Sequence, residues 1–402
     1  MSGILSITFR CDSRLIRLIF AGVLLVACMA CESGPAATIG ERSHESVRAQ
    51  ADGFCPGCDA DELIDRLRLE EAPTPVRERP GWSPPRRVVV TLGNEAGVEW
   101  LRSAVPDVEV IAAPDMETAL RSVRGADALI GSCSPRLVEA GTNLKWIQLP
   151  YAGAEDCVAV PAISERDILL TNAQRLYGPE IAEHTLAMLL AFTRGLYRYI
   201  PEQDEGDWSR GLVPRDAMWE LEHKTILIVG LGGIGTEVAR LADAFGMRVT
   251  ATRRSSRSGP AFVDYVGLAH ELLELARDAD VVVNATPLTP ETEDLFDAEF
   301  FAVMKPTAYF INVGRGGSVV TEHLVSALES GGIAGAGLDV TDPEPLPPDH
   351  RLWRLPNVII TPHVAAQSDR ARQRVWTLIR ENLRRYAAGE PMLSVVDVER
   401  GY

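Results

Sequence analysis

Three glycines in the stretch ILIVGLGGIGTEVAR have the spacing that lets a backbone approach a phosphate. Gly230, Gly232 and Gly235 form a G-x-G-x-x-G pattern between a strand-like apolar run and a helical pattern. Gly230 would allow the tight turn, Gly232 the approach of a pyrophosphate, and Gly235 the packing of the helix on the strand. Free N–H groups at the helix start, around Gly233 and Ile234, would then face the phosphates. We therefore expect a dinucleotide site; the alternative is a glycine-rich turn without a ligand.

Two arginines stand where a dinucleotide-binding unit usually has an acidic residue. That residue lies ~20 positions after the last glycine and holds the adenosine ribose. Here the positions are Arg253 and Arg254, followed by Ser255 and Ser256. Two guanidinium groups would clamp a 2′-phosphate, and the hydroxyls would add hydrogen bonds. We therefore favour NADP(H), with NAD(H) as the alternative if these residues form only a solvated basic turn.

The elements that must position these groups follow an α/β pattern. Apolar runs typical of buried strands occur at 86–92, 108–113, 126–132 and 144–150. Helical spacing separates them, and a long apolar helix over 181–200 leads to a second strand series ending near 366. Strands that alternate with helices indicate a parallel sheet covered on both faces.

We therefore predict an α/β fold with two Rossmann-like, doubly wound domains. A flavodoxin-like substrate-binding domain would span 86–178 and be completed by the terminal segment 366–402. The dinucleotide-binding domain would span 179–365.

Six motifs occur in a fixed order along the chain: LPYAGAED, GPEIAEHTLAMLLAFTR, GLGGIGTEVARLADAFGM, NATPLTPET, KPTAYFINVGRGG and AGLDVTDPEPLPPDHRLWRLPNVIITPH. Together, over residues 86–395, they resemble the D-isomer-specific 2-hydroxyacid dehydrogenases. The resemblance implies reduction of a small 2-oxo acid to a D-2-hydroxy acid with NAD(P)H, and the reverse. It also implies a homodimer formed through the connecting helix. Glyoxylate and hydroxypyruvate are the first candidate substrates.

The same resemblance assigns a catalytic trio. The motif NVGRG places the arginine at Arg315, LDVTDPEP the glutamate at Glu344, and TPH the histidine at His363. His363 would give the proton to the carbonyl oxygen, because imidazole exchanges protons near neutral pH. Glu344 would favour the imidazolium and hold its orientation. Arg315 would bind the substrate carboxylate and stabilise the developing negative charge.

Other positions carried over from the family surround this trio. Backbone amides around Ala152 and Gly153 would hold the substrate carboxylate, because small residues let the backbone approach closely. Tyr151 precedes them and would border the substrate and shape specificity; the alternative is a packing role. The cofactor would also meet a further group of residues: Thr286, Pro287, Val313 and Asp339. The connecting helix would face the nicotinamide through Glu180 and Ile181, and His350 and Trp353 would border the site.

The first 85 residues fall outside this resemblance. Arg10, Arg14 and Arg17 precede an uncharged, mostly apolar run that is too short for a membrane span, which needs ~20 residues. We interpret 1–30 as an export signal or anchor, with LVAC as a lipoprotein box that would lipidate Cys28. The alternative is a misread signal and a cytoplasmic protein. Residues 31–85, rich in proline and charge, are predicted to be a flexible tether, in which DELIDRLRL could form a short amphipathic helix.

The seven cysteines do not suggest a disulfide framework for the folded part. Cys133 and Cys157 alone fall within the α/β series. Cys55 and Cys58 form one CPGC pair, which leaves zinc, a local disulfide or no role open; we predict no metal site.

Acidic residues outnumber basic ones, 56 to 40, and the net charge is −16. Nucleic acid is therefore excluded as a partner, because phosphate backbones need a basic face. A small anionic 2-oxo acid remains suitable where arginines gather locally. The alternative function is a catalytically weak, dinucleotide-responsive regulatory protein.

Overall fold

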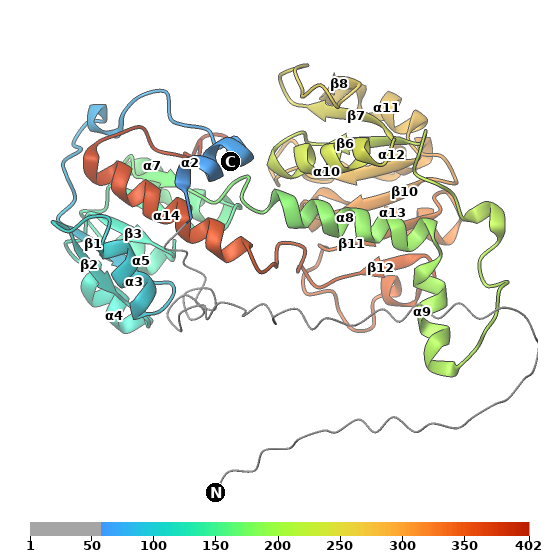
Figure 1. Cartoon of the computed structure of the whole chain (residues 1–402), viewed down its shortest axis with the longest axis horizontal. Helices are drawn as coiled ribbons and strands as arrows, with labels where there is room; N and C mark the ends of the chain where they lie inside the picture. Colours follow the sequence, from blue (N-terminus) through green and yellow to red (C-terminus); the bar gives the residue numbers. More distant parts are fainter. Residues whose placement is uncertain (1–57, 402) are drawn as a thin grey trace, which may run out of the picture. The chain divides into compact units, whose positions relative to one another are not determined.

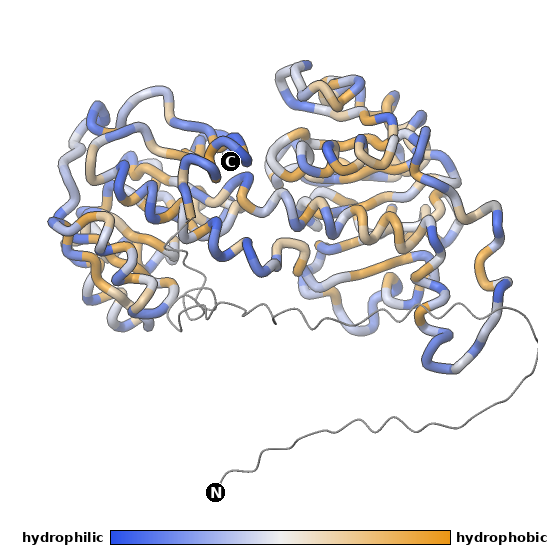
Figure 2. Tube along the Cα trace, in the orientation of Figure 1, coloured by the Kyte–Doolittle hydropathy of each residue, from blue (hydrophilic) through white to orange (hydrophobic). Residues whose placement is uncertain are grey.

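The computed structural model describes residues 58–401, with the side chain of one residue in the 215–217 turn left aside. The predicted signal, Cys28 and Cys55 lie outside the described residues. Two parallel sheets organise the described chain (Figure 1). Hydrophobic segments coincide with the strands and with the helix faces that cover them (Figure 2). No helix within 58–401 is long and apolar enough to span a bilayer.

The first sheet has five parallel strands in the order β2-β1-β3-β4-β5. They are β1 Arg87–Val90, β2 Glu109–Ala112, β3 Ala128–Ile130, β4 Trp146–Gln148 and β5 Leu169–Thr171. The helices between them are α3 Glu95–Arg102, α4 Met116–Ser122, α5 Pro135–Ala140, α6 Glu155–Val158 and α7 Pro161–Glu165. This is the flavodoxin-like strand order, in which ligands bind at the carboxyl ends of the strands.

The second sheet has seven parallel strands in the order β12-β11-β10-β9-β6-β7-β8. They are β6 Thr225–Val229, β7 Arg248–Arg253, β8 Tyr265–Leu268, β9 Val281–Asn284, β10 Tyr309–Asn312, β11 Gly335–Leu338 and β12 Val358–Ile360. The covering helices are α10 Gly233–Ala244, α11 Leu272–Asp278, α12 Ala298–Val303 and α13 Thr321–Glu329. Short 3-10 turns lie at Arg215–Ala217, Ala269–Glu271, Gly316–Ser318 and Arg351–Arg354. Together the two sheets confirm the predicted fold class.

The long apolar helix predicted over 181–200 is two helices. α8 spans Gly178–Thr193 and α9 spans Leu196–Glu205. Gly195 separates them with a φ of 71°, a left-handed conformation that suits glycine and ends a helix. The apolar pattern runs through this break, so periodicity alone did not show it.

The prediction of a flexible tether is wrong for residues 58–85. α2 spans Ala60–Leu67, a 3-10 turn spans Val76–Glu78, and Glu71 forms a β-bridge with Leu393. Leu67 and Val76 are buried in the core of the first sheet. The last helix, α14 Ala371–Ala388, packs into the same core through Trp376 and Tyr386. These long-range contacts stabilise a segment whose local sequence is poor in regular structure.

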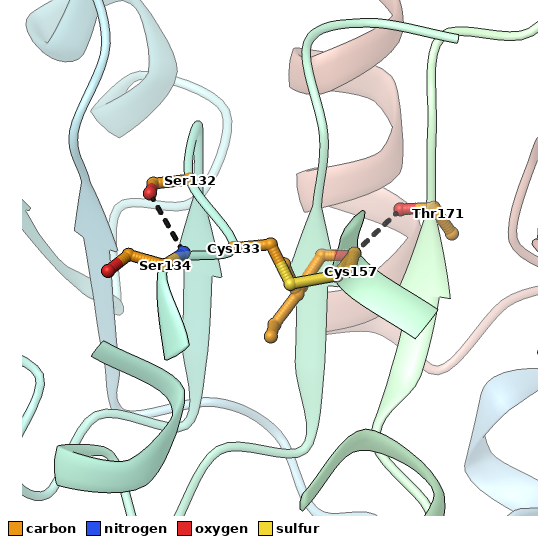
Figure 3. The surroundings of a disulfide bond; sticks show 6 residues. Ser132, Cys133, Ser134, Cys157 and Thr171 are labelled. Atoms are coloured by element: carbon orange, nitrogen blue, oxygen red, sulfur yellow. Dashed lines mark hydrogen bonds between the residues drawn. A yellow bond between two sulfur atoms is a disulfide. The ribbon is translucent and has the colours of Figure 1, made fainter. Parts of the chain in front are cut away.

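Cys133 and Cys157 form a disulfide, contrary to the expectation from cysteine spacing. Cys133 follows β3, and Cys157 lies on α6 after the neighbouring strand β4 (Figure 3). The carboxyl ends of adjacent parallel strands meet at one edge of a sheet, which brings the two residues together across 24 positions. Cys58 is disulfide-bonded as well.

Candidate active site

The glycine turn joins β6 to α10 and leaves its backbone open. Gly230 has a φ of 95°, and a Cβ there would lie 2.8 Å from the carbonyl oxygen of Ala285. A Cβ at Gly235 would lie 2.1 Å from the oxygen of Gly230. At Gly232, by contrast, no described atom lies within 4 Å of such a Cβ. Two glycines therefore allow the turn to pack, and the third leaves room for a phosphate, so the residues present fit a dinucleotide.

The arginines at the end of β7 and in the segment after it differ in their hydrogen-bond and ion-pair partners. The Nε of Arg253 donates to the carbonyl of Leu231 at 3.1 Å, which ties it to the glycine turn. Arg254 and Ser255 are exposed, and the Ser256 hydroxyl pairs with Ser258. Arg257 is committed elsewhere, in a 2.7 Å ion pair with Glu271. Arg253 and Arg254, at the end of β7 and directly after it, are therefore the candidates for a 2′-phosphate.

The loop after β9 is fixed by one asparagine. The Asn284 side-chain oxygen accepts from the amide and the hydroxyl of Thr286, at 3.0 and 2.7 Å. The carbonyl of Pro287 accepts from Thr292 at 2.6 Å. The Val313 amide donates to the Asn284 carbonyl at 3.2 Å. Three residues assigned to the cofactor therefore lie in one hydrogen-bonded group.

The loop that carries Arg315 is fixed by the same asparagine through a buried, uncharged network. The Nδ2 of Asn284 donates to Asn312 at 2.9 Å and to the Ser318 hydroxyl at 2.7 Å. Asn312 and Ser318 both donate to the Arg315 carbonyl, at 3.0 and 2.6 Å. Asn284, Asn312 and Ser318 are at most 1% exposed. Sequence reasoning missed all three, although each of two neighbouring apolar strands, VVVN and YFIN, ends in an asparagine.

The Arg315 side chain reaches across to the loop after β4. A Cβ at Gly153 would lie 2.4 Å from Nη2 of Arg315, so glycine is needed for this approach. The Arg315 Nε donates to the Glu155 carboxylate at 3.0 Å, and both side chains are about one-third exposed. The Ala152 carbonyl accepts from Asn172 at 2.6 Å, which anchors the loop. Sequence reasoning did not identify Glu155.

Tyr151 precedes this loop and is 45% exposed. Burial of its ring, with the nearby charge of Asp156, raises the pKa of the Tyr151 hydroxyl above its usual value. Tyr151 therefore stays a neutral hydrogen-bonding group at physiological pH.

His363 and Glu344 form the acid–base pair of the site. The His363 Nδ1 lies 2.6 Å from Oε1 of Glu344, and the two side chains are 48% and 42% exposed. His363 adopts a φ of 52°, which costs a non-glycine residue about 1–2 kcal/mol. Its amide donates to the Asp339 carbonyl at 2.8 Å, which helps to hold this backbone. With Nδ1 engaged by Glu344, the Nε2 atom is left to face a substrate.

The Asp339 carboxylate fixes the loop of His363 by accepting hydrogen bonds from it. Its carboxylate is 4% exposed and accepts from the Thr361 hydroxyl at 2.6 Å and the amides of Val364 and Ala365 at 2.9 and 3.0 Å. The carboxylate assigned to the nicotinamide therefore already has three donors from the chain.

Two pairs of residues carried over from the family have other contacts here. Glu180 is buried and paired with Arg374 of α14, and Ile181 packs in the core of the second sheet. Burial raises the pKa of Glu180 despite this pairing. His350 caps the 3-10 turn at Arg351–Arg354, and the Trp353 indole donates to Pro347. Among residues 58–401, none of these four forms a hydrogen bond or an ion pair with His363 or Arg315.

Comparisons with known proteins identify the family of this chain. Residues 186–365 match the family model described as D-isomer specific 2-hydroxyacid dehydrogenase, NAD binding domain. The human glyoxylate reductase/hydroxypyruvate reductase is 36% identical over 311 residues, 77% of this chain and 93% of the relative. This chain belongs to the D-isomer specific 2-hydroxyacid dehydrogenase family.

Other family members extend the agreement. The glyoxylate reductase of Thermofilum pendens is 35% identical and covers 71% of this chain and 86% of its own length. The NADPH-dependent glyoxylate/hydroxypyruvate reductase of Sinorhizobium meliloti, solved with NADP and sulfate, matches with a TM-score of 0.68 and 31% identity. That match covers 79% of this chain and 99% of the solved one.

Proposed function

We propose that this protein reduces small 2-oxo acids to D-2-hydroxy acids with NADPH. The observation that carries the proposal is the His363–Glu344 pair, 2.6 Å apart, with the loop of His363 held by the buried Asp339 carboxylate. The pair lies in a chain whose relatives include glyoxylate and hydroxypyruvate reductases.

The residues divide the reaction among them. The glycine turn, with open space at Gly232, would hold the phosphates of a dinucleotide, and the reduced nicotinamide would supply the hydride for C2 of the substrate. Arg315 and the backbone at Gly153 bind the substrate carboxylate, and Arg315 also stabilises negative charge on the carbonyl oxygen. His363 gives its Nε2 proton to that oxygen, while Glu344 holds the ring orientation through Nδ1. In the reverse direction His363 removes the same proton.

The cofactor preference rests on Arg253 and Arg254. Arg253 is the last residue of β7 and Arg254 follows it, at the place where an acidic residue would favour NADH. The Sinorhizobium meliloti reductase was solved with NADP, and a Xanthobacter autotrophicus family member, 30% identical, was solved with NADPH. Replacement of both arginines by alanine should raise KM for NADPH and leave KM for NADH nearly unchanged. Arg257→Ala is the matched control, because Arg257 is paired with Glu271.

The activity test is NADPH and NADH oxidation with glyoxylate and with hydroxypyruvate. His363→Ala should lower kcat by about 10²–10⁴-fold, the usual contribution of a general acid. A variant that turns over like the wild type would exclude His363 from catalysis. A wild-type protein that binds NADPH tightly and reduces neither acid would instead favour the regulatory alternative.

We also propose a homodimer formed through α9 and the segment that follows it. Leu196, Ile200 and Trp208 are 45%, 61% and 88% exposed, an amount of apolar surface that a partner would cover. Sedimentation of the wild type and of Ile200→Asp with Trp208→Asp tests this. A wild-type protein that sediments as a monomer would exclude the dimer.

For localisation we propose export, with membrane attachment through Cys28. The Cys133–Cys157 disulfide supports this proposal, because disulfides persist mainly in oxidising compartments. Thiol alkylation of protein from freshly lysed producing cells, without reductant, is the test. Full labelling of Cys133 and Cys157 would place the protein in a reducing compartment.

A further inference from the structure

A basic pocket lies beside the glycine turn and is built partly by the segment before residue 86. It has a volume of about 110 Å³. Four arginines line it, together with other residues of α10 and its surroundings: Arg66, Arg68, Arg175, Arg240, Gly233, Thr236, Glu237 and Phe262. The family resemblance begins at about residue 86, so α2 brings Arg66 and Arg68 from outside the shared fold.

The local sequence explains why these two arginines point outward. Leu67 and Leu69 are each 6% exposed and packed in the first core, while Arg68 between them is exposed. Arg68 ends α2 with a φ of 51°, and its amide donates to Ile64. Burial of the flanking leucines therefore fixes the direction of Arg68, and Arg66 lies on the exposed side of α2.

The charges of the pocket do not cancel. Arg175 is paired with Glu70 at 2.5 Å, and Arg240 with Glu237 at 2.8 Å. Within residues 58–401, the side chains of Arg66 and Arg68 make no ion pair or hydrogen bond. Counting the described residues alone, the pocket therefore keeps two positive charges without an ion-pair partner, in a protein whose net charge is −16.

The size and chemistry of the pocket select a small oxyanion. Cavities for drug-sized ligands measure about 300–1,000 Å³, so this one is too small for a dinucleotide. It equals the space of a few water molecules, at about 30 Å³ each. Guanidinium groups that approach from α2, α10 and Arg175 suit an anion with several oxygens, and the Thr236 hydroxyl adds a donor.

We propose that this pocket binds a tetrahedral phosphate group, separate from the dinucleotide site. Arg66 and Arg68 supply the positive charge that attracts the phosphate. Arg175 and Arg240, each paired with a glutamate, line the rest of the pocket. A phosphate bound there connects the N-terminal segment to the first turn of α10. The group comes either from a free phosphate or from a lipid headgroup, since both offer the same oxygens.

The test is calorimetric titration of the full chain with inorganic phosphate at saturating NADPH. The cofactor blocks the dinucleotide site but leaves the substrate site at Arg315 open, so the part of the binding that depends on Arg66 and Arg68 reports the pocket. We expect saturable binding that weakens at least about tenfold in Arg66→Ala with Arg68→Ala, since charge-assisted hydrogen bonds to both are lost. Arginine and alanine at position 68 both meet the cost of the left-handed backbone conformation, so this substitution changes the side chain and not the backbone strain. Arg121→Ala with Arg124→Ala removes the same charge from exposed positions on and beside α4 and should bind phosphate as the wild type does.

A second arm identifies the source of the phosphate. Flotation with phosphatidylcholine vesicles, with or without phosphatidylglycerol, compares the wild type with the same two double variants. The predicted anchor contributes equally to all of them, so a loss confined to the Arg66/Arg68 variant assigns a lipid headgroup. Phosphate binding without that loss assigns a free phosphate.

Three results would overturn the proposal. The first is phosphate binding that disappears when NADPH saturates the protein. The second is equal phosphate affinity in the wild type and the Arg66/Arg68 variant, or an equal loss in the control variant. The third is no phosphate binding in the calorimetric titration together with no loss of vesicle binding in the Arg66/Arg68 variant.

Discussion

Arg315 and His363 are expected to act on the same substrate, but the chain positions them in different ways. The loop of Arg315 rests on uncharged groups: Asn284, Asn312 and Ser318, all at most 1% exposed. The loop of His363 rests on the carboxylate of Asp339, 4% exposed, which accepts three hydrogen bonds. The hydrogen bonds that hold the Arg315 loop are shared among three side chains, whereas those that hold the His363 loop all end on the single carboxylate of Asp339.

The two supports differ in how a single change would act on them. The Arg315 carbonyl accepts from Asn312 and from Ser318, so it keeps one donor if the other is lost. The amide of Ala365 has only the Asp339 carboxylate as an acceptor among the described residues. A buried donor left without an acceptor costs about 1–3 kcal/mol. The concentrated support of His363 is therefore the more sensitive one.

Asp339→Asn should have the largest effect of these tests. The side-chain amide of the new asparagine would place N–H donors against the backbone amide of Ala365 or against the donors that face Oδ1. The free energy of unfolding should fall by about 1–3 kcal/mol. kcat should fall by about 10²-fold, because a misplacement of ~1 Å has that effect. Denaturant unfolding and NADPH oxidation with glyoxylate measure the two quantities.

Asp342→Asn is the control, because it removes the same charge from an exposed position in the loop before Glu344. It should change neither quantity appreciably. Wild-type turnover in Asp339→Asn would show that Asp339 does not position His363.

The parts of the site differ in how far the sequence alone predicted them. The glycine turn was predicted from spacing alone, because its function depends on three local positions. His363, Glu344 and Arg315 were assigned through a resemblance to known motifs. The network of Asn284, Asn312 and Ser318 was missed, since its members meet only when β9 and β10 pair in register.

The same limit explains the errors in the fold. The Cys133–Cys157 disulfide and the bridge of Glu71 with Leu393 both join segments distant in the sequence. Neither leaves a local pattern. A useful signal was nevertheless present, because polar or cysteine residues just after neighbouring parallel strands gather at one edge of the sheet.

Ser318→Ala should have a smaller effect than Asp339→Asn. The Arg315 carbonyl keeps Asn312 as a donor, and the Asn284 Nδ2 keeps Asn312 as an acceptor. We expect a loss of about 0.5–1.5 kcal/mol in the free energy of unfolding and a moderate rise in KM for the 2-oxo acid. Ser330→Ala is the control, because its exposed hydroxyl bonds only to carbonyls of its own helix. A kcat loss as large as that of Asp339→Asn would contradict the difference between the two supports.

Glu155→Gln should have the smallest effect, and of the opposite sign. In the structure the Glu155 carboxylate lies on Arg315, beside Gly153, where the substrate carboxylate is expected. The substrate must therefore compete with an anion of the chain itself. Exposed ion pairs contribute about 0–1 kcal/mol, and both side chains are about one-third exposed. Glutamine keeps the shape and the acceptor but removes the charge, so KM for glyoxylate should fall by up to about fivefold.

Asp156→Asn separates contact from charge in this test. It removes the same charge from the next residue of α6, which is exposed and makes no ion pair within the described chain. KM should fall less than in Glu155→Gln, and the difference should shrink as salt screens the exposed groups. Equal falls in KM would mean that general charge near the site, and not the Glu155–Arg315 contact, limits substrate binding. In that case the Glu155 contact would not matter for Arg315. The difference between the Arg315 and His363 loops would then lie only in the buried groups that hold them.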